Sequence, residues 1–404
     1  MPLSPRAKSA STIANDNKIR DAAIDIANQI GLQHLRFGHI VEHTGLTTGA
    51  LYSRFADHND LLAALWIDRL RDPFVKLLED AMAAFDSEDS QAVHDLAEHL
   101  HKLSKVEWAA IEAVIIAPRI PELDEIVTED VVECLATLGL TPQFSGNDVH
   151  GIKVITVISL MFACAFNSFI DKGVDDWKSI FALHRFVIND LKAVNGQKVL
   201  SHGPLPVNAD TDDQLRNTLI NATAEVIARS GIDGATLARI ARRARMTSGA
   251  VYTLYETKDE LITDAIKVLM SAAHSDTTSL VQESKAVGDT FTSTMQVYSL
   301  AFDPTRRSFR RFRLEVLTSA RTDADTKALV RGLYRQRMKD YEKMFAVDPR
   351  FSADFVRTVG RTGQMQPVGF SILEHYINTP ENVNMLPLSS AVTRNVYNVL
   401  AHAN

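Results

Sequence analysis

The chain has 404 residues, 46% of them hydrophobic and 23% charged, and its formal net charge at pH 7 is −7. This length exceeds that of one typical domain, and the composition excludes a disordered or fibrous protein. Its two cysteines, Cys134 and Cys164, lack metal-ligand or redox spacing, which excludes a disulfide framework and favours the reducing cytoplasm. The polar N-terminus lacks the apolar segment of a signal peptide, so we expect no secretion.

The first predicted elements are four short helices. Apolar residues recur at helical spacing over residues 17–30, and a second helix is predicted over residues 37–43. A turn containing Gly45 leads to Thr47, a good N-cap residue, which opens a third helix in the sequence TTGALYSRF. A fourth helix begins near Asp57. A helix, a tight turn with glycine and a second helix are typical of a helix-turn-helix module.

The same layout recurs two hundred residues later without a gap. The sequence TSGAVYTLY at 247–255 matches TTGALYSRF at 47–55, and the pair Ile40 and Ile240 keeps the same offset. An internal repeat at a fixed offset indicates two copies of one structural unit in the chain.

Residues 154–170 form the most apolar run of the sequence. The run contains Thr156, Ser159 and Asn167, and it barely reaches the length that spans a bilayer. The run is too apolar to face solvent, and its polar residues make it unsuitable for lipid. We therefore predict a helix buried against another helix, within the contact between the two halves, and no membrane partner.

The boundary between the halves is predicted where Gly, Pro, Asn and Asp concentrate, at residues 194–214. We expect helix-turn-helix domains at 1–66 and 214–266, helical bodies at 67–195 and 267–404, and a linker at 196–213. Neither body shows strand patterns, so the predicted fold class is all-α, with two fused repeats. A faint similarity between IEAV at 111–114 and LEVL at 314–317 extends the repeat into the bodies.

The stretch IRDAAIDIANQIG, followed by IVEHTGLTTGALYSRFADHNDLLAAL, resembles the N-terminal domain of the TetR family of bacterial repressors. Residues 219–262 resemble it again. Members of that family usually bind DNA as homodimers and carry a helical effector-binding body. The resemblance implies double-stranded DNA and a small apolar or amphipathic effector as partners, and a monomeric pseudo-dimer that carries its dimer internally. Further pairing of chains stays open.

The resemblance, together with the distribution of basic side chains, gives the candidate DNA-contacting residues. In the first copy they are Arg36, Thr47, Thr48, Gly49, Tyr52, Ser53, Arg54 and His58. In the second copy they are Thr236, Arg239, Arg243, Thr247, Ser248, Gly249, Tyr252, Thr253 and Lys258. Small residues at the start of a recognition helix let backbone amides approach a phosphate, and polar side chains one turn on reach base edges.

The two copies differ in charge and in their departures from the family pattern. The lysine that begins the fourth helix in the family is Lys258 in the second copy and His58 in the first, while Gly45 of the first turn is replaced by Arg245. Residues 36–58 carry no net charge, whereas 236–258 carry five basic residues against one acidic residue, a net +4. We expect the second copy to bind phosphate more strongly and the operator to be asymmetric. Alternatively, its arginines form only a solvated face.

Two weaker patterns allow alternatives. His94, Glu98 and His101 share one helical face, which suits either a metal or, as we expect, only solvent. Residues 306–316 interleave five arginines with Phe309 and Phe312. They either line an entrance for an anionic ligand such as an acyl-CoA or are surface charges on a helix whose phenylalanines are core. The spacing favours the second interpretation.

The sequence contains no glycine-rich phosphate loop after a strand, no G-x-S-x-G motif and no catalytic constellation. We therefore expect no enzyme, no catalytic residues, no metal and no cofactor, and ligand-binding residues are not identified. The function that we expect is a transcriptional repressor released by an effector. The alternative is an architectural or co-repressor DNA-binding protein without an effector.

Overall fold

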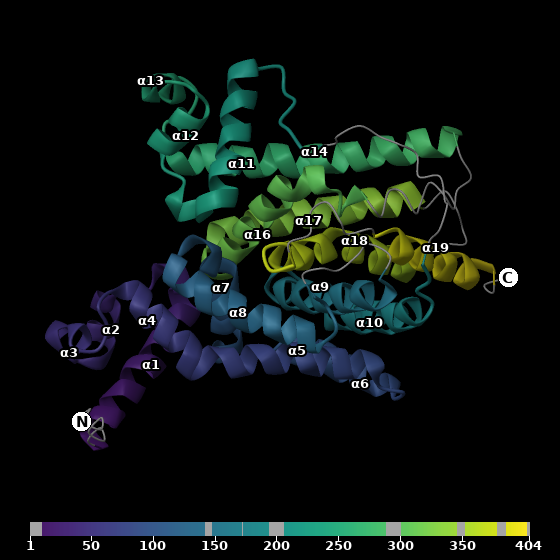
Figure 1. The fold of residues 1–404 in the computed structure, drawn as a ribbon. Helices are drawn as coiled ribbons and strands as arrows, with labels where there is room; N and C mark the ends of the chain where they lie inside the picture. Colours follow the sequence, from purple (N-terminus) through teal and green to yellow (C-terminus); the bar gives the residue numbers. More distant parts are fainter. Residues whose placement is uncertain are drawn as a thin grey trace. The chain divides into compact units, whose positions relative to one another are not determined.

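The computed structural model describes residues 10–141, 148–171, 173–193, 206–287, 300–345, 352–377 and 385–401. Over these ranges the regular structure is helical and contains no strand, so the predicted all-α class is confirmed (Figure 1). The chain divides into two compact units, one of Met1–Leu77 and Leu103–Val131, the other of Leu78–Lys102 and Val132–Asn404. Residues 196–205 of the predicted linker lie outside the described residues.

The first unit begins with the four predicted short helices. It contains α1 (Ala10–Ile30), η1 (Leu32–His34), α2 (Phe37–Thr44), α3 (Thr48–Tyr52), α4 (His58–Leu65), the π-helical turn η2 (Trp66–Leu70), the start of α5 (Arg71–Asp86), α7 (Lys105–Ile116), η3 (Ala117–Arg119) and most of α8 (Pro121–Thr137). A capping box of Ser104 and Glu107 opens α7, whose residues from Trp108 onward are all buried. One of them is a carboxylate: Glu112 accepts the Leu32 N–H at 2.8 Å, which ties the turn after α1 to the unit's core.

The second unit holds the remaining helices. They are the end of α5, α6 (Ser90–Leu100), α9 (Val149–Ile170), α10 (Val174–Asn189), α11 (Gln214–Gly234), α12 (Leu237–Arg243), α13 (Ser248–Tyr252), α14 (Lys258–Val287), η4 (Pro304–Arg306), α16 (Arg307–Thr322), α17 (Ala324–Phe345), α18 (Ala353–Leu373) and α19 (Leu386–Ala401). Buried Cys164 lies on α9, and Cys134 near the end of α8 is buried as well.

The apolar run 154–170 lies in α9, and α9 packs along α18 of the second half as predicted (Figure 1). A Cβ on Gly369 would lie 2.0 Å from the Ser159 carbonyl oxygen, so the missing side chain lets the two helices touch. Gln366 donates to Ser159 Oγ at 3.2 Å. By length and composition α9 is able to cross a membrane, but 83% of its most apolar window is buried against protein.

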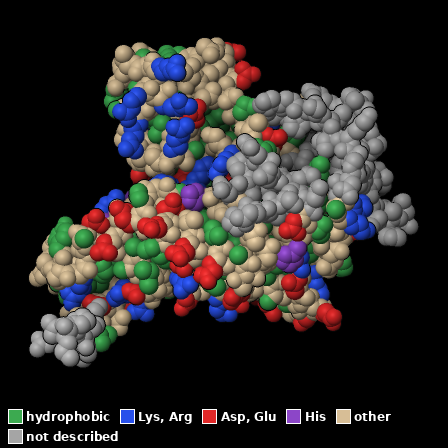
Figure 2. All heavy atoms as spheres, in the orientation of Figure 1, with side chains coloured by type: hydrophobic (Ala, Val, Ile, Leu, Met, Phe, Trp, Pro, Cys, Tyr) green, Lys and Arg blue, Asp and Glu red, His purple; other side chains and the backbone are tan. Residues whose placement is uncertain are grey.

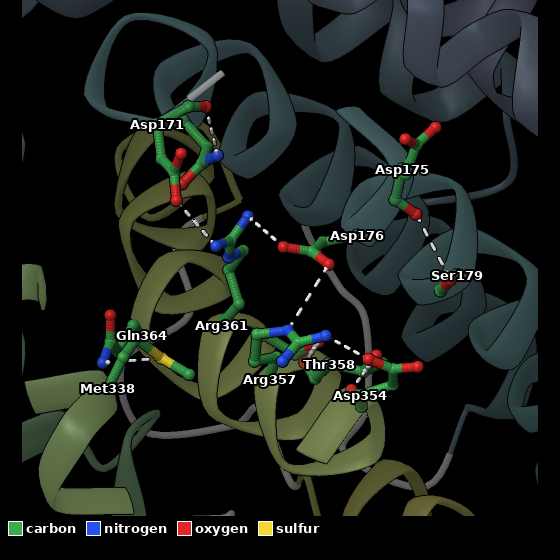
Figure 3. A network of polar contacts seen from close by, with 12 residues as sticks. Asp171, Asp175, Asp176, Ser179, Met338, Asp354, Arg357, Thr358, Arg361 and Gln364 are labelled. Atoms are coloured by element: carbon green, nitrogen blue, oxygen red, sulfur yellow. Dashed lines mark hydrogen bonds and ion pairs between the residues drawn. The ribbon is translucent and has the colours of Figure 1, made fainter. Parts of the chain in front are cut away.

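Arginines of the second half bind acidic groups of the first half around this contact. Arg361 forms ion pairs of 2.7 Å with both Asp171 and Asp176, which lie just after α9 and in α10 (Figure 3). Arg394 on α19 lies 2.8 Å from Asp190. Arg331 adds hydrogen bonds to the last carbonyls of α9. The cations come from one half and their partners from the other.

Three of the five arginines in residues 306–316 are buried, which contradicts the favoured interpretation that they are surface charges. Phe309 and Phe312 are buried as predicted, but Arg306, Arg310 and Arg313 are only 5%, 2% and 6% exposed and are not surface charges. For Arg310 the reason is a buried acid far away in the sequence. Glu374, just after α18, forms a bidentate pair with Arg310 at 2.5 and 3.0 Å.

Candidate nucleic-acid interface

The turn between α2 and α3 is built by two local features. Gly45 takes the left-handed conformation, with φ of 68°, and its N–H closes α2 on the Val41 carbonyl. Thr47 then caps α3, because its Oγ1 accepts the Ala50 N–H at 3.2 Å. Leu51 is buried and anchors α3, so the opposite face of this short helix is turned outward.

That outward face carries most candidates of the first copy. Thr47, Thr48, Gly49, Tyr52 and Ser53 are exposed, and Tyr52 is 61% accessible although its ring meets Phe37 edge-on at 5.1 Å. A Cβ on Gly49 would find its nearest neighbour only at 3.9 Å, the Thr47 hydroxyl. Gly49 therefore adds no side chain over the first turn of α3, which leaves room for an anion at the start of this helix.

Two of the three basic candidates of the first copy are engaged by their own domain, and the third is uncharged. Arg54 donates to Asp16 at 2.7 Å and to the Ala50 carbonyl at 2.7 Å. Arg36 precedes α2 and donates to the carbonyls of Gln33 and Leu35. His58 is half-buried, and this burial, reinforced by the charge of Arg36, lowers its pKa to about 4. The His58 ring is therefore neutral near pH 7.

The second copy repeats this geometry at an offset of 200 residues. Helices α3 and α13 span corresponding residues, Thr247 caps α13 by accepting the Ala250 N–H at 3.3 Å, and Tyr252 is 58% exposed. Ser248, Gly249 and Thr253 are exposed as well. At the turn, Arg245 takes the place of Gly45 with φ of 58°, a conformation that is unfavourable for a residue with a Cβ.

Basic side chains surround α12 and α13, and Figure 2 shows several of them gathered there. Thr236 caps α12 through the Arg239 N–H. Arg239 donates to the Gly234 carbonyl and Lys258 to the Ile232 carbonyl, at 3.0 and 3.2 Å. Arg243 pairs with Glu225 of α11. A capping box opens α14, because the Glu260 N–H donates to Thr257 Oγ1 at 3.1 Å and the Thr257 N–H donates to the Glu260 carboxylate at 3.4 Å.

Sequence reasoning missed two acids that lie beside the candidates. Asp16 is held by Arg54, and Glu225 by Arg243, at sequence separations of 38 and 18 residues. The net charges given above for residues 36–58 and 236–258 do not include these two acids. The first helix of each copy crosses the helices that follow it, so its charged side chains belong to the same surface. A net charge summed over the whole copy would have included both acids.

The candidate metal face is occupied by other contacts. Glu98 lies 2.5 Å from the Lys178 ammonium, and the His101 ring contacts the Ala97 carbonyl and the Cys164 sulfur. Among the described residues, no group of three His, Cys, Asp or Glu side chains is placed to hold a metal ion.

The comparison with protein families identifies one of the two copies. Residues 219–265 match the family model described as bacterial regulatory proteins of the tetR family. These residues are therefore similar to the TetR-family model. A comparison with curated proteins gave no match. Among solved structures, a transcriptional regulator from Rhodococcus sp. Rha1 aligns with a TM-score of 0.36 and 19% identity, over 46% of this chain and 96% of that one.

The TetR-type domain includes α11, α12, α13 and the start of α14. Thr236, Arg239, Arg243, Thr247, Tyr252 and Lys258 all lie within the matched range. The match over residues 219–265 supports a DNA-binding transcriptional regulator.

Proposed function

We propose that the chain is a tandem TetR-type transcriptional repressor whose two non-identical DNA-binding domains act together in one polypeptide. The main support is the helix-turn-helix geometry of the first copy, at residues 37–58, which has the same cap, the same exposed tyrosine and the same short helix as the domain that matches the family. Two recognition helices in one chain replace the pair that a homodimer provides.

The arrangement of the helical bodies adds a second line of support. Helices α9 and α10 of the first half contact α18 and α19 of the second half, and α9 and α18 occupy matching places, each next to last in its half. Arg361 and Arg394 bind Asp171 and Asp190 across this contact. Such complementary charges favour pairing of unlike halves over pairing of two like halves.

The two domains differ at residues that meet DNA in this proposal. Arg54 is matched by Leu254, Ser53 by Thr253 and His58 by Lys258. We therefore propose an asymmetric operator, occupied in the cytoplasm by one chain, and release of the operator when a small apolar or amphipathic effector binds a helical body. The linker makes the second contact intramolecular, so a second chain is not required.

Footprinting of the DNA beside the protein's own gene, together with the mass of the complex, tests this proposal. We expect an asymmetric protected sequence with one chain per operator. Replacement of Tyr52 or of Tyr252 by Ala should each remove protection from a different half-site. A symmetric site occupied by two chains, or a footprint that is indifferent to Tyr52→Ala, would contradict the tandem arrangement.

A further inference from the structure

Among the described residues, Arg313 on α16 is a buried arginine whose hydrogen-bond partners are neutral. On α16 and the turn before it, Arg306 pairs with Asp276, Arg310 with Glu374 and Arg311 with Glu315. Arg313 is only 6% exposed. Its Nη2 donates to the Tyr334 hydroxyl at 3.0 Å and to the Gln364 carbonyl, while its Nε is buried and unpaired.

The groups around Arg313 are donors that lack a strong acceptor. Because the Tyr334 hydroxyl oxygen accepts from Arg313, its own proton is left to donate elsewhere. The Gln364 side chain is 2% exposed, and its amide reaches only the Met338 sulfur at 3.6 Å, a weak acceptor (Figure 3). Arg313 thus contacts the Tyr334 hydroxyl and the Gln364 backbone carbonyl, and the Gln364 amide contacts Met338, which lies one helical turn from Tyr334 on α17.

Two aromatic rings also lie beside the guanidinium. Its central carbon lies 5.8 Å from the centre of the Phe309 ring and 6.0 Å from that of Tyr334. A buried cation without an anion is unfavourable, because ring faces and neutral acceptors replace only part of its hydration. An anion bound there would satisfy the guanidinium and the two other donors together.

We propose that Arg313 binds the carboxylate of an amphipathic ligand, and, building on the proposed function, that this acid is the effector. A guanidinium presents two parallel N–H groups that match the two oxygens of a carboxylate. A single cation among aromatic rings suits one negative charge better than the two of a phosphate monoester. Phe309 and Met338 would contact the hydrocarbon part of the acid. Arg313, Tyr334 and Gln364 together form the acid-binding cluster.

Calorimetric titration of the full chain, without DNA, tests this cluster. The probes are benzoate, hexanoate and decanoate, with 1-decanol and decyl phosphate as neutral and dianionic counterparts. At least one carboxylate should bind, 1-decanol should not, and Arg313→Met should weaken carboxylate binding at least tenfold. Tyr334→Phe removes one donor and should weaken it less. No binding of any carboxylate, equal binding of decyl phosphate, or binding that survives Arg313→Met would overturn the proposal.

Thermal unfolding separates a ligand anchor from a structural arginine. Without ligand, Arg313→Met should unfold at the same or a higher temperature than the natural chain, because it replaces an unpaired buried charge by an apolar side chain. A marked fall of the unfolding midpoint would mean that Arg313 is structural and would count against the proposal. Arg335→Met, at an exposed position of α17, is the matched control and should change neither binding nor unfolding. Because the titration contains no DNA, its outcome is independent of the operator experiment.

Discussion

Arg54, just beyond α3, donates to Asp16 of α1 with 2.7 Å between Nε and Oδ1. The corresponding residues of the second copy are Leu254 and Arg216, and Arg216 instead binds Asp264, at 2.6 and 2.8 Å. Each copy therefore fixes its first helix by an ion pair, but with different partners. In the first copy the arginine of this pair is Arg54, which the family resemblance placed among the DNA-contacting residues.

We expect this pair to stabilise the first copy. Asp16→Ala and Arg54→Ala should each destabilise α1 to α4 by about 1–3 kcal/mol, because both side chains are largely buried and each substitution removes one partner of their ion pair. Native-state hydrogen exchange of peptides from α1 to α4 measures this loss. The double variant should lose much less than the sum of the single variants. Leu254→Ala is the control in the second copy, and simple additivity of the first two losses would show that the pair is not coupled.

The two copies should contribute unequally to DNA affinity. Lys258→Ala and Arg243→Ala should weaken binding to all sequences and lower the magnitude of the salt slope by roughly one unit for each lost phosphate contact. His58→Ala should have little effect near pH 7, since the low pKa of His58 keeps its ring neutral there. Gel shifts over a series of salt concentrations provide the comparison. Equal losses in the two copies would mean that the charge difference between them does not matter.

A buried histidine should make the protein sensitive to acid. His184 on α10 is 1% exposed, and burial lowers its pKa from 6.5 to about 4. Between these values the unfolded chain binds a proton that the folded chain does not, so folded-state stability falls as the pH drops from about 6.5 towards 4. His184→Phe should flatten this part of the curve of unfolding midpoint against pH. An unchanged curve would assign the acid sensitivity to other groups, among which His58 has a similarly lowered pKa.

The sequence predicted the elements whose signals are local. Thr47 and Thr247 are caps, Gly45 closes α2, and residues 154–170 form a buried helix, because capping and periodicity act over a few residues. Partners far along the chain were not predictable in this way. Nothing near Arg310 indicates Glu374, which lies 64 residues away, so a charged run with buried partners has the same local pattern as a solvated face.

The contact between α9 and α18 leads to a last prediction, at Gly369. A Cβ there would lie 2.0 Å from the Ser159 carbonyl oxygen and 2.8 Å from its carbonyl carbon, and backbone atoms inside a helix cannot move away alone. Gly369→Ala should therefore push the helices apart and cost about 1–3 kcal/mol or more. Gly363 lies on the same helix, and its Cβ would find nothing within 4 Å, so Gly363→Ala should stabilise α18 by about 0.5–1 kcal/mol. Thermal unfolding of both variants measures the difference. If this contact also holds the two DNA-binding domains together, Gly369→Ala should reduce operator binding towards that of one domain, with a smaller salt slope. An unchanged unfolding midpoint in Gly369→Ala would show that the two helices do not need this close approach.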